Sequence, residues 1–287
     1  MNLGETNTAR LPAIPASVPA KGIARIGRRF VASQVALSRA FDRLLPQSFR
    51  IDGSKDFKQR IVPSYLRSGL VVYDIGGGGR PCVDMETKRR LGLRLIGLDI
   101  DAEEFAKAPP GLYDHTIVAD VTSYQVGNVA DLVVCKSTLE HVSDTGAALA
   151  AMARLLRPGG TLLVFAPSRN ALYARLNVLL PERLKRRLLS TFMPGQADHL
   201  GFPAKYDRCT PHHFCSSIAG QGLEIKELRP YYISSYFSIL FPVYVLWRAW
   251  ILAYRAVARE QAAETFALIA CKPERRLSAQ WSQREAL

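Results

Sequence analysis

Short apolar runs alternate with longer amphipathic segments over most of the chain. The runs have strand-like composition and the segments between them have helical spacing, which together are typical of parallel-sheet α/β domains. The pattern predicts a doubly wound, mostly parallel seven-stranded sheet, with a turn at Arg157-Pro158-Gly159-Gly160 before the fifth strand. The predicted strands are residues 70–75, 94–100, 115–119, 131–135, 161–166, 223–228 and 265–271.

A basic amphipathic helix is predicted over residues 21–45. Apolar residues recur there at roughly helical spacing, from Ile23 to Leu44, and arginines are interleaved with them. Such a helix either packs on the domain as a lid or lies on a membrane surface, and the sequence leaves both interpretations open.

A second unusual segment, residues 236–254, is apolar almost throughout except at Arg248. It is long enough to cross a bilayer, but crossing would separate the strand at 265–271 from the sheet that it should complete. Two interpretations remain. The segment is a helix buried on the domain or in a dimer contact, or it is an interfacial helix that places aromatic residues at headgroup level. Those aromatic residues are Tyr244, Trp247, Trp250 and Tyr254.

These segments suggest a domain organisation. Residues 1–20 are expected to be a flexible, proline-containing tail, and residues 21–69 an N-terminal helical extension. The domain itself is expected over 70–273, with a substrate insertion at about 168–215 and an apolar helical insertion at about 233–260. Residues 274–287 would form a basic C-terminal tail.

Composition sets limits on function. Hydrophobic residues make up 48% and charged residues 22%, as in ordinary globular proteins. The net charge of +13 favours anionic partners such as nucleic acid, acidic lipid or a phosphorylated substrate, although a solvated basic surface would explain it equally well. Five cysteines without a CxxC pair, and a polar N-terminus without a signal-peptide pattern, indicate a cytoplasmic protein.

The strongest single motif is Asp74-Ile75-Gly76-Gly77-Gly78-Gly79, directly after the first predicted strand. Glycines there allow a sharp turn and the close approach of a ligand to bare backbone. A dinucleotide-binding fingerprint would need a further glycine where Pro81 stands, and a P-loop would need Gly-Lys-Ser/Thr, which is absent. Nicotinamide and nucleoside triphosphate ligands are therefore disfavoured.

Acidic residues follow the next two strands. Asp99 ends the second strand, where α/β cofactor folds place a carboxylate for ribose hydroxyls, and Asp120 follows the third, within reach of an adenine edge. Each acid alone would more often be a helix cap or a turn residue. Together with the glycines, at the carboxyl ends of neighbouring strands, they indicate a cofactor site.

These residues resemble the class I S-adenosylmethionine-dependent methyltransferase family, in particular its small-molecule, type 11-like branch. The matching segments are Val72-Tyr73-Asp74-Ile75-Gly76-Gly77-Gly78, Ile96-Gly97-Leu98-Asp99-Ile100, Ala119-Asp120-Val121, Ser137-Thr138-Leu139-Glu140-His141-Val142 and Leu156-Arg157-Pro158-Gly159-Gly160-Thr161-Leu162. The resemblance implies a Rossmann-like methyltransferase fold with helical insertions and S-adenosylmethionine as the cofactor.

The resemblance also implies roles for single residues. Asp74, Gly76 and Gly78 would contact the methionine portion of the cofactor. Asp99, with Ile100 beside it, would hold the ribose, and Asp120 with Val121 would border the adenine. Two positions depart from the family pattern: Arg80 replaces a frequent loop glycine, and Pro81 stiffens the exit from the loop.

Candidate catalytic residues are fewer. Methyl transfer from a sulfonium is an in-line displacement that depends mainly on orientation, and a hydroxyl acceptor gains from a general base. His141 follows the fourth strand and should border the methyl group, although in the family the Glu-His pair is often structural. His199 and Asp207 lie in a polar, turn-rich insertion and are candidates for catalysis, with Tyr206 and Arg208 as substrate contacts.

Other kinds of chemistry have less support in the sequence. Cys209-x2-His212-His213-x-Cys215 would have to converge within seven residues to bind zinc, so no metal is expected. Cys135 is expected to be a buried hydrophobe. No Asn-Pro-Pro-Tyr or Asp-Pro-Pro-Tyr run follows the fourth strand, so nucleic-acid base methylation is disfavoured.

The function expected from the sequence is O-methylation of a small or lipid-linked metabolite with a sugar or phenol-like acceptor, in the cytoplasm or peripherally at the inner membrane face. RNA or protein methylation, and a catalytically silent cofactor-binding scaffold, remain as alternatives. The sequence leaves the oligomeric state open.

Overall fold

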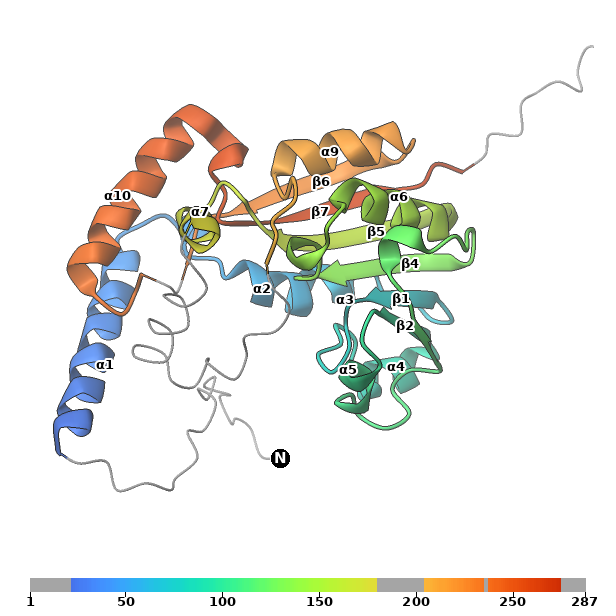
Figure 1. Cartoon of the computed structure of the whole chain (residues 1–287), viewed down its shortest axis with the longest axis horizontal. Coiled ribbons are helices and arrows are strands. Elements are labelled where there is room, and N and C mark those ends of the chain that lie inside the picture. Colours follow the sequence, from blue (N-terminus) through green and yellow to red (C-terminus); the bar gives the residue numbers. More distant parts are fainter. Residues whose placement is uncertain (1–21, 180–203, 235–236, 275–287) are drawn as a thin grey trace, which may run out of the picture.

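The computed structural model describes residues 22–179, 204–234 and 237–274 and contains one seven-stranded sheet (Figure 1). The strand order is β3-β2-β1-β4-β5-β7-β6. Strand β7 is antiparallel to both of its neighbours, and the remaining pairs are parallel. The strands are β1 Val71–Ile75, β2 Arg94–Asp99, β3 His115–Val118, β4 Ala130–Lys136, β5 Leu156–Pro167, β6 Glu224–Tyr231 and β7 Thr265–Cys271. The predicted doubly wound, mostly parallel sheet is confirmed.

Helices cover both faces of this sheet (Figure 1). The α-helices are α1 Gly22–Asp42, α2 Gly53–Asp56, α3 Val62–Tyr65, α4 Met85–Leu91, α5 Ala102–Ala106, α6 Thr145–Leu155, α7 Leu172–Leu179, α9 Pro211–Gly220 and α10 Phe241–Ala258. Short 3-10 segments lie at Gln47–Phe49, Val121–Ser123, Leu139–His141 and Arg259–Ala262, and a π turn at Phe57–Ile61.

Two hydrophobic clusters lie on opposite sides of the sheet. The first includes Leu149 and Met152 of α6 and Phe214 of α9, and the second includes Phe57 and Val62 from the N-terminal extension. The central strands are buried on both faces and consist of almost continuous apolar residues for that reason. The sheet therefore fixes the positions of its carboxyl-end loops from both sides.

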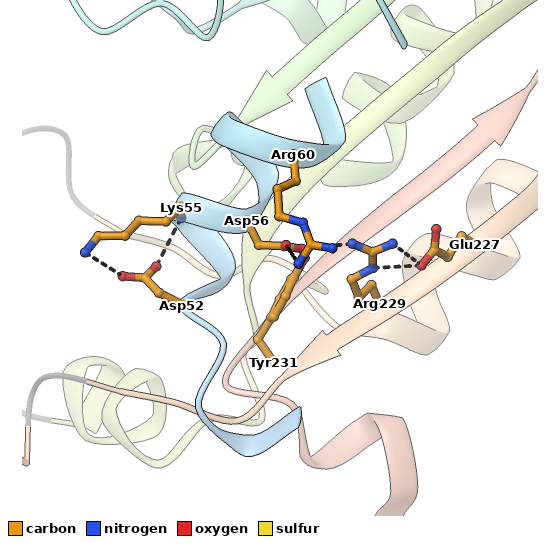
Figure 2. A network of polar contacts seen from close by, with 7 residues as sticks. All are labelled: Asp52, Lys55, Asp56, Arg60, Glu227, Arg229 and Tyr231. Carbon is orange, nitrogen blue, oxygen red and sulfur yellow. Dashed lines mark hydrogen bonds and ion pairs between the residues drawn. The ribbon is translucent and has the colours of Figure 1, made fainter. Parts of the chain in front are cut away.

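The N-terminal extension is attached to the sheet through a polar contact at β6 (Figure 2). The Asp56 carboxylate is 5% exposed and accepts hydrogen bonds from the Tyr231 hydroxyl at 2.6 Å and the Arg229 guanidinium at 2.9 Å. Burial raises the pKa of Asp56, but the bonds from Tyr231 and Arg229 outweigh burial and leave it below its ordinary value. Arg229 also pairs with Glu227 at 2.7 Å. This network joins α2 to the far end of the sheet.

Strand β5 begins earlier than the sequence pattern predicts. The four residues expected to form a turn, 157–160, lie within the strand, and Leu156 pairs with Ala130 across a shift in register. Gly159 has a φ of +82° there. The predicted turn is therefore an irregularity inside the strand, because β4 pairs with Leu156 before it and Thr161 after it, and Lys272, directly after β7, bonds to Gly159 and Gly160.

The predicted N-terminal helix exists as α1, and it lies beside α10 at one end of the sheet (Figure 1). Among the described residues, no helix combines the length and apolar character that crossing a membrane requires. The placement of Tyr244 and Trp247 at headgroup level is wrong, because both side chains are 2% exposed and pack inward. Residues 1–20 and the tail beyond residue 274 lie outside the described residues.

Candidate functional site

The glycine loop after β1 is shaped by close contacts that a larger residue would prevent. Gly76 has a φ of +67°, and a Cβ atom there would lie 2.3 Å from Thr138. Gly77 packs against Asp74, with a hypothetical Cβ 2.3 Å from its carboxylate. The bare backbone of this loop therefore fits between β1 and the segment that follows β4.

Asp74 lies behind the loop. Its carboxylate is 1% exposed and accepts hydrogen bonds from the Cys82 backbone N–H at 3.3 Å and the Tyr113 hydroxyl at 3.2 Å. Burial raises the pKa of Asp74 to about 6. The Tyr113 hydroxyl also donates to the Gly78 carbonyl at 3.3 Å. In this structure Asp74 and Tyr113 hold the loop from behind, and direct contact of Asp74 or Gly78 with a ligand stays a prediction.

A cavity of about 910 Å³ opens in front of the loop, at the carboxyl ends of β1 to β4. This is the edge at which open α/β sheets bind ligands. The lining comes from five separate segments of the chain, one of which is the glycine loop. These lining residues are Ile75, Gly76, Gly77, Gly79, Arg80, Leu98, Asp99, Ile100, Glu104, Lys107, Ala119, Asp120, Val121, Lys136, Ser137, Thr138, His141, Val142, Ser143 and Lys205.

Four of the predicted cofactor residues line one end of this cavity. Asp99 ends β2, and its carboxylate accepts the Asp101 backbone N–H at 3.1 Å. Burial raises the pKa of Asp99. Ile100 beside it is 58% exposed, so an apolar wall faces the cavity. Asp120 accepts from the Thr122 backbone N–H and hydroxyl, both at 2.8 Å, and Val121 is buried behind it.

The other end of the cavity is formed by the segment after β4. Ser137 has a φ of +55°, and Thr138 donates to the Ile75 carbonyl at 3.2 Å, so this segment is tied to the glycine loop. His141 lines the cavity, with Nε2 3.9 Å from the Glu140 carboxylate. Glu140 is buried, and burial raises its pKa to about 7. Its carbonyl accepts backbone N–H groups from Lys205 and the residue after it.

The described part of the predicted substrate insertion lines the cavity through Lys205 and not through the residues expected to do so. Tyr206 is 5% exposed and has a φ of +52°. The Asp207 carboxylate accepts the Thr145 backbone N–H at 3.1 Å, so it satisfies a further free N–H at the start of α6, where Asp144 is the N-cap. Neither residue lines the cavity, nor does Arg208, whereas Lys205 does. His199 lies outside the described residues.

Charge is divided between the two ends of the cavity. The carboxylates of Asp99, Glu104 and Asp120 line the β2 and β3 end, where Glu104 pairs with Lys107. The β4 end carries Lys136, His141 and Lys205, and among the described residues no carboxylate lines that end. The Lys136 ammonium lies 5.8 Å from the centre of the Phe165 ring. The cavity can therefore hold a hydroxyl-rich group at one end and an anionic group at the other.

Two cysteines lie in the core near the site. Cys135 is fully buried and Cys209 is 0% exposed, and burial raises the pKa of both thiols, that of Cys209 to about 12. Within the part of the chain that the structure covers, no group of three His, Cys, Asp or Glu side chains is placed to hold a metal ion.

Comparison with known proteins agrees with this geometry. Residues 73–164 match the family described as "Methyltransferase domain". A Thiobacillus denitrificans protein named ubiquinone biosynthesis O-methyltransferase is 31% identical over 195 residues, which is 62% of this chain and 78% of that protein. The chain belongs to the class I S-adenosylmethionine-dependent methyltransferase family.

Other members of this methyltransferase family match over shorter stretches. An Aeromonas salmonicida protein of the same name is 26% identical over 167 residues, 56% of this chain and 65% of that protein. A Rhodopseudomonas palustris one is 35% identical over 109 residues, 36% of this chain and 42% of that protein. The chain thus spans less than two thirds of the length of these two relatives.

Similarity to solved methyltransferase structures is remote. An S-adenosylmethionine-dependent methyltransferase from Mesorhizobium loti superimposes with a TM-score of 0.48 at 16% identity, covering 77% of this chain and 99% of that one. The family assignment rests on the sequence relatives and on the family match.

The cofactor of this family, S-adenosylmethionine, fits the residues present. The turn at Gly76, where a Cβ would collide with Thr138, leaves backbone open to the cavity, and the exposed Ile100 offers an apolar surface for a flat ring. Asp99 is the carboxylate at the end of β2 that a ribose requires. Lys136 and Lys205 were not predicted as site residues from the sequence. They lie 69 positions apart, and no local motif shows that both line the same cavity.

Proposed function

We propose that this chain is an S-adenosylmethionine-dependent O-methyltransferase whose acceptor is a small phenol-like hydroxyl, free or carried on a lipid. The observation that carries the proposal is the cavity at the carboxyl edge, acidic where the cofactor ribose would lie and cationic beyond β4. The names of the relatives, which are O-methyltransferases of ubiquinone biosynthesis, support the acceptor class. A cytoplasmic location with peripheral contact to the inner membrane face belongs to this proposal.

One group of residues would bind the cofactor. Asp99 and Ile100 would hold the ribose and adenine side of the cofactor, with Asp120 and Val121 beyond them. When bound, the cofactor supplies an electrophilic methyl group on a sulfonium. The chain itself has to orient the acceptor and exclude water, which is catalysis by proximity.

The cationic end suggests how a hydroxyl becomes nucleophilic. Lys136 and Lys205 would stabilise a phenolate more than the neutral phenol, since an opposite charge nearby favours the ionised form. A phenol bound there would release its proton at lower pH than in water. His141, which lines the same end, could accept that proton.

Cofactor binding is tested by calorimetric titration with S-adenosylmethionine. Asp99→Asn should weaken binding by about 10-fold or more, because a charge-assisted hydrogen bond contributes roughly 1.5–3 kcal/mol. The matched control is Asp84→Asn, an exposed acid that caps α4 outside the cavity and should keep wild-type affinity. A folded wild type that does not bind the cofactor would refute the proposal.

Acceptor chemistry is tested by transfer of the methyl group to an alkyl-substituted catechol. Lys136→Gln and Lys205→Gln should each lower kcat/KM for the catechol about 10-fold and move the alkaline rise of the pH profile upward, with cofactor affinity unchanged. Lys55→Gln, at a side chain 63% exposed, is the control and should keep the wild-type profile. If the protein binds S-adenosylmethionine but transfers its methyl group to no phenol, arylamine or RNA, the chain is a catalytically silent cofactor-binding scaffold.

A further inference from the structure

Helix α10 exposes an unbroken apolar strip along its whole length. The strip consists of Val243, Leu246, Trp250, Ala253 and Val257, spaced alternately three and four residues apart, so its members lie on one side of the helix. Leu246 is 71% exposed and Val257 86%. The other exposed positions beside the strip, Pro242, Ala249 and Ala256, are also apolar.

The opposite side of α10 is anchored firmly to the protein. Tyr244, Trp247 and Ile251 are almost fully buried, and so is Arg248, whose guanidinium pairs with Asp42 of α1 at 2.7 Å. It also donates to the carbonyl of Tyr232 at 2.6 Å, directly after β6. The exposed strip is therefore held in a fixed orientation by a well-packed helix.

Helix α1, which lies beside α10, combines exposed apolar and cationic residues (Figure 1). Phe30 and Leu37 of the helix and Leu44, two residues after its end, are exposed at intervals of seven residues. Arg29 and Arg39 of the helix are exposed as well, and so is Arg43 directly after it. The only carboxylate in the sequence of the two helices is Asp42, and it is paired with the buried Arg248.

This combination identifies a binding surface. Most of the exposed large hydrophobic side chains among the described residues belong to α1, α10 or their flanks, and clustered exposure of this kind marks interaction sites. A second copy of the chain would bring two arginine-rich α1 helices together in a protein of net charge +13, which opposes association. An anionic lipid surface is complementary to both the apolar strip and the arginines.

We propose that α1 and α10 together form a docking surface for anionic lipid bilayers, with α10 lying in the interface and the α1 arginines on acidic headgroups. The surface follows β6, whose carboxyl end lies at the same edge of the sheet as the cavity. Docking would hold that edge toward the bilayer. The inference deepens the peripheral membrane contact of the proposed function, and it can fail without methyl transfer failing, because lipid binding does not depend on cofactor or acceptor.

The apolar contribution is tested by flotation of the full chain with vesicles of phosphatidylcholine containing 30% phosphatidylglycerol. Wild type should float with these vesicles. Leu246→Glu and Trp250→Glu should each weaken binding at least about 10-fold, because burial of one large apolar side chain is lost. Val126→Glu is the matched control, since Val126 is exposed in a loop away from both helices and should leave binding unchanged.

The charge contribution is tested with paired arginines. Arg39→Glu/Arg43→Glu should weaken binding at least about 25-fold, given roughly 1 kcal/mol for each arginine lost near an acidic surface and the repulsion that each glutamate adds. Arg89→Glu/Arg90→Glu makes the same charge change at two exposed positions on α4 and should have a small effect. Vesicles of phosphatidylcholine alone should bind wild type weakly.

Sedimentation velocity tests whether a second copy of the chain binds this surface instead of a bilayer. The docking surface predicts a monomer in solution, and all variants should keep wild-type cofactor affinity because none lines the cavity. A wild-type dimer that Leu246→Glu converts to monomer would overturn the proposal and assign the surface to a second copy. Absence of flotation by wild type, or flotation equal for Leu246→Glu and wild type, would overturn it as well. Each of these results leaves the cofactor titration, and hence the proposed methyl transfer, unaffected.

Discussion

Gly76 allows the backbone of the glycine loop to pass close to Thr138. Two separate constraints act at this position: a φ of +67°, which disfavours any side chain, and the space that Thr138 already occupies. Gly76→Ala should therefore cost more than backbone strain alone, about 2 kcal/mol or more in the free energy of unfolding. It should also reduce S-adenosylmethionine affinity, because the loop lines the cavity. Urea denaturation and calorimetry measure the two effects.

Gly92→Ala is the matched control. Gly92 has a similar φ of +59° at the end of α4, but a Cβ there would meet nothing within 4 Å. The substitution should cost only the strain of the left-handed conformation, about 1 kcal/mol. Cofactor affinity should be unchanged. Equal losses of stability and affinity in the two variants would show that contact with Thr138 has no role.

Single residues were predictable where a local motif carries the chemistry. Asp99 and Asp120 lie at the ends of apolar runs that form parallel strands. Because the carboxyl ends of parallel strands lie at the same edge of a sheet, both residues had to lie at that edge. Lys205 could not be found in this way, because its place in the cavity depends on backbone bonds from residues 205 and 206 to the Glu140 carbonyl. The role of Asp207 could not be predicted for the same reason, because only the fold shows that its carboxylate accepts the Thr145 backbone N–H at the start of α6.

At the level of elements, Arg248 joins four separate segments. Its guanidinium pairs with Asp42 of α1 and donates to the carbonyls of Phe49 and Tyr232, and it lies 4.8 Å from the centre of the Trp247 ring. Arg248→Ala should lower the free energy of unfolding by about 3–5 kcal/mol, because it leaves Asp42 buried without its partner. Urea denaturation followed by circular dichroism measures the change.

Arg255→Ala on the same helix is the control for this prediction. Arg255 is exposed and lies over the Phe49 and Tyr232 rings at 5.0 and 5.4 Å, so its removal should cost about 1 kcal/mol or less. In an Asp42→Ala background, Arg248→Ala should cost clearly less than in wild type, which a double-mutant cycle detects. Strictly additive losses would contradict a direct Asp42–Arg248 contribution.

Elements were predicted well where the hydrophobic period is clear. Each predicted strand has a counterpart in the sheet, although β5 begins earlier than its apolar run. The agreement is best for the central strands such as β4, because strands buried on both faces must be apolar throughout. Helix α10 was found as a helix, but its buried side was not. Its sequence is apolar on nearly every side, so the pattern cannot distinguish the inward Trp247 from the outward Trp250. The inward side follows from Asp42, a partner 206 positions away in the sequence.

For the molecule as a whole, buried carboxyl groups link stability to pH. Burial raises the pKa of Glu140 and Glu264 to about 7 and that of Asp74 to about 6. Such groups bind protons in the folded state at a pH where the unfolded chain has already released them. The stability that they contribute is fully present below about pH 4 and is lost as the pH rises through 6 to 7.

Glu264 offers the clearest test, because it is fully buried outside the cavity, and burial raises its pKa more than the bonds from the Trp247 side chain and the Leu172 backbone lower it. Its ordinary pKa of 4.5 applies to the unfolded chain, so ionisation between pH 5 and pH 8 should cost the folded state about 2 kcal/mol. Glu264→Gln cannot ionise. The free energy of unfolding of this variant relative to wild type should therefore rise by that amount over the interval.

Glu86→Gln is the control, since Glu86 is exposed on α4 and its variant should follow the wild-type curve at every pH. Urea denaturation at pH 5, 6, 7 and 8 gives the three curves. Parallel curves for Glu264→Gln and wild type would mean that Glu264 is ionised in the folded protein throughout. If the Glu264→Gln and wild-type curves meet at pH 5 and separate at pH 8, the loss of stability is due to ionisation of Glu264. Carboxyl groups with a lowered pKa, such as Asp56, titrate at lower pH and do not contribute over this interval.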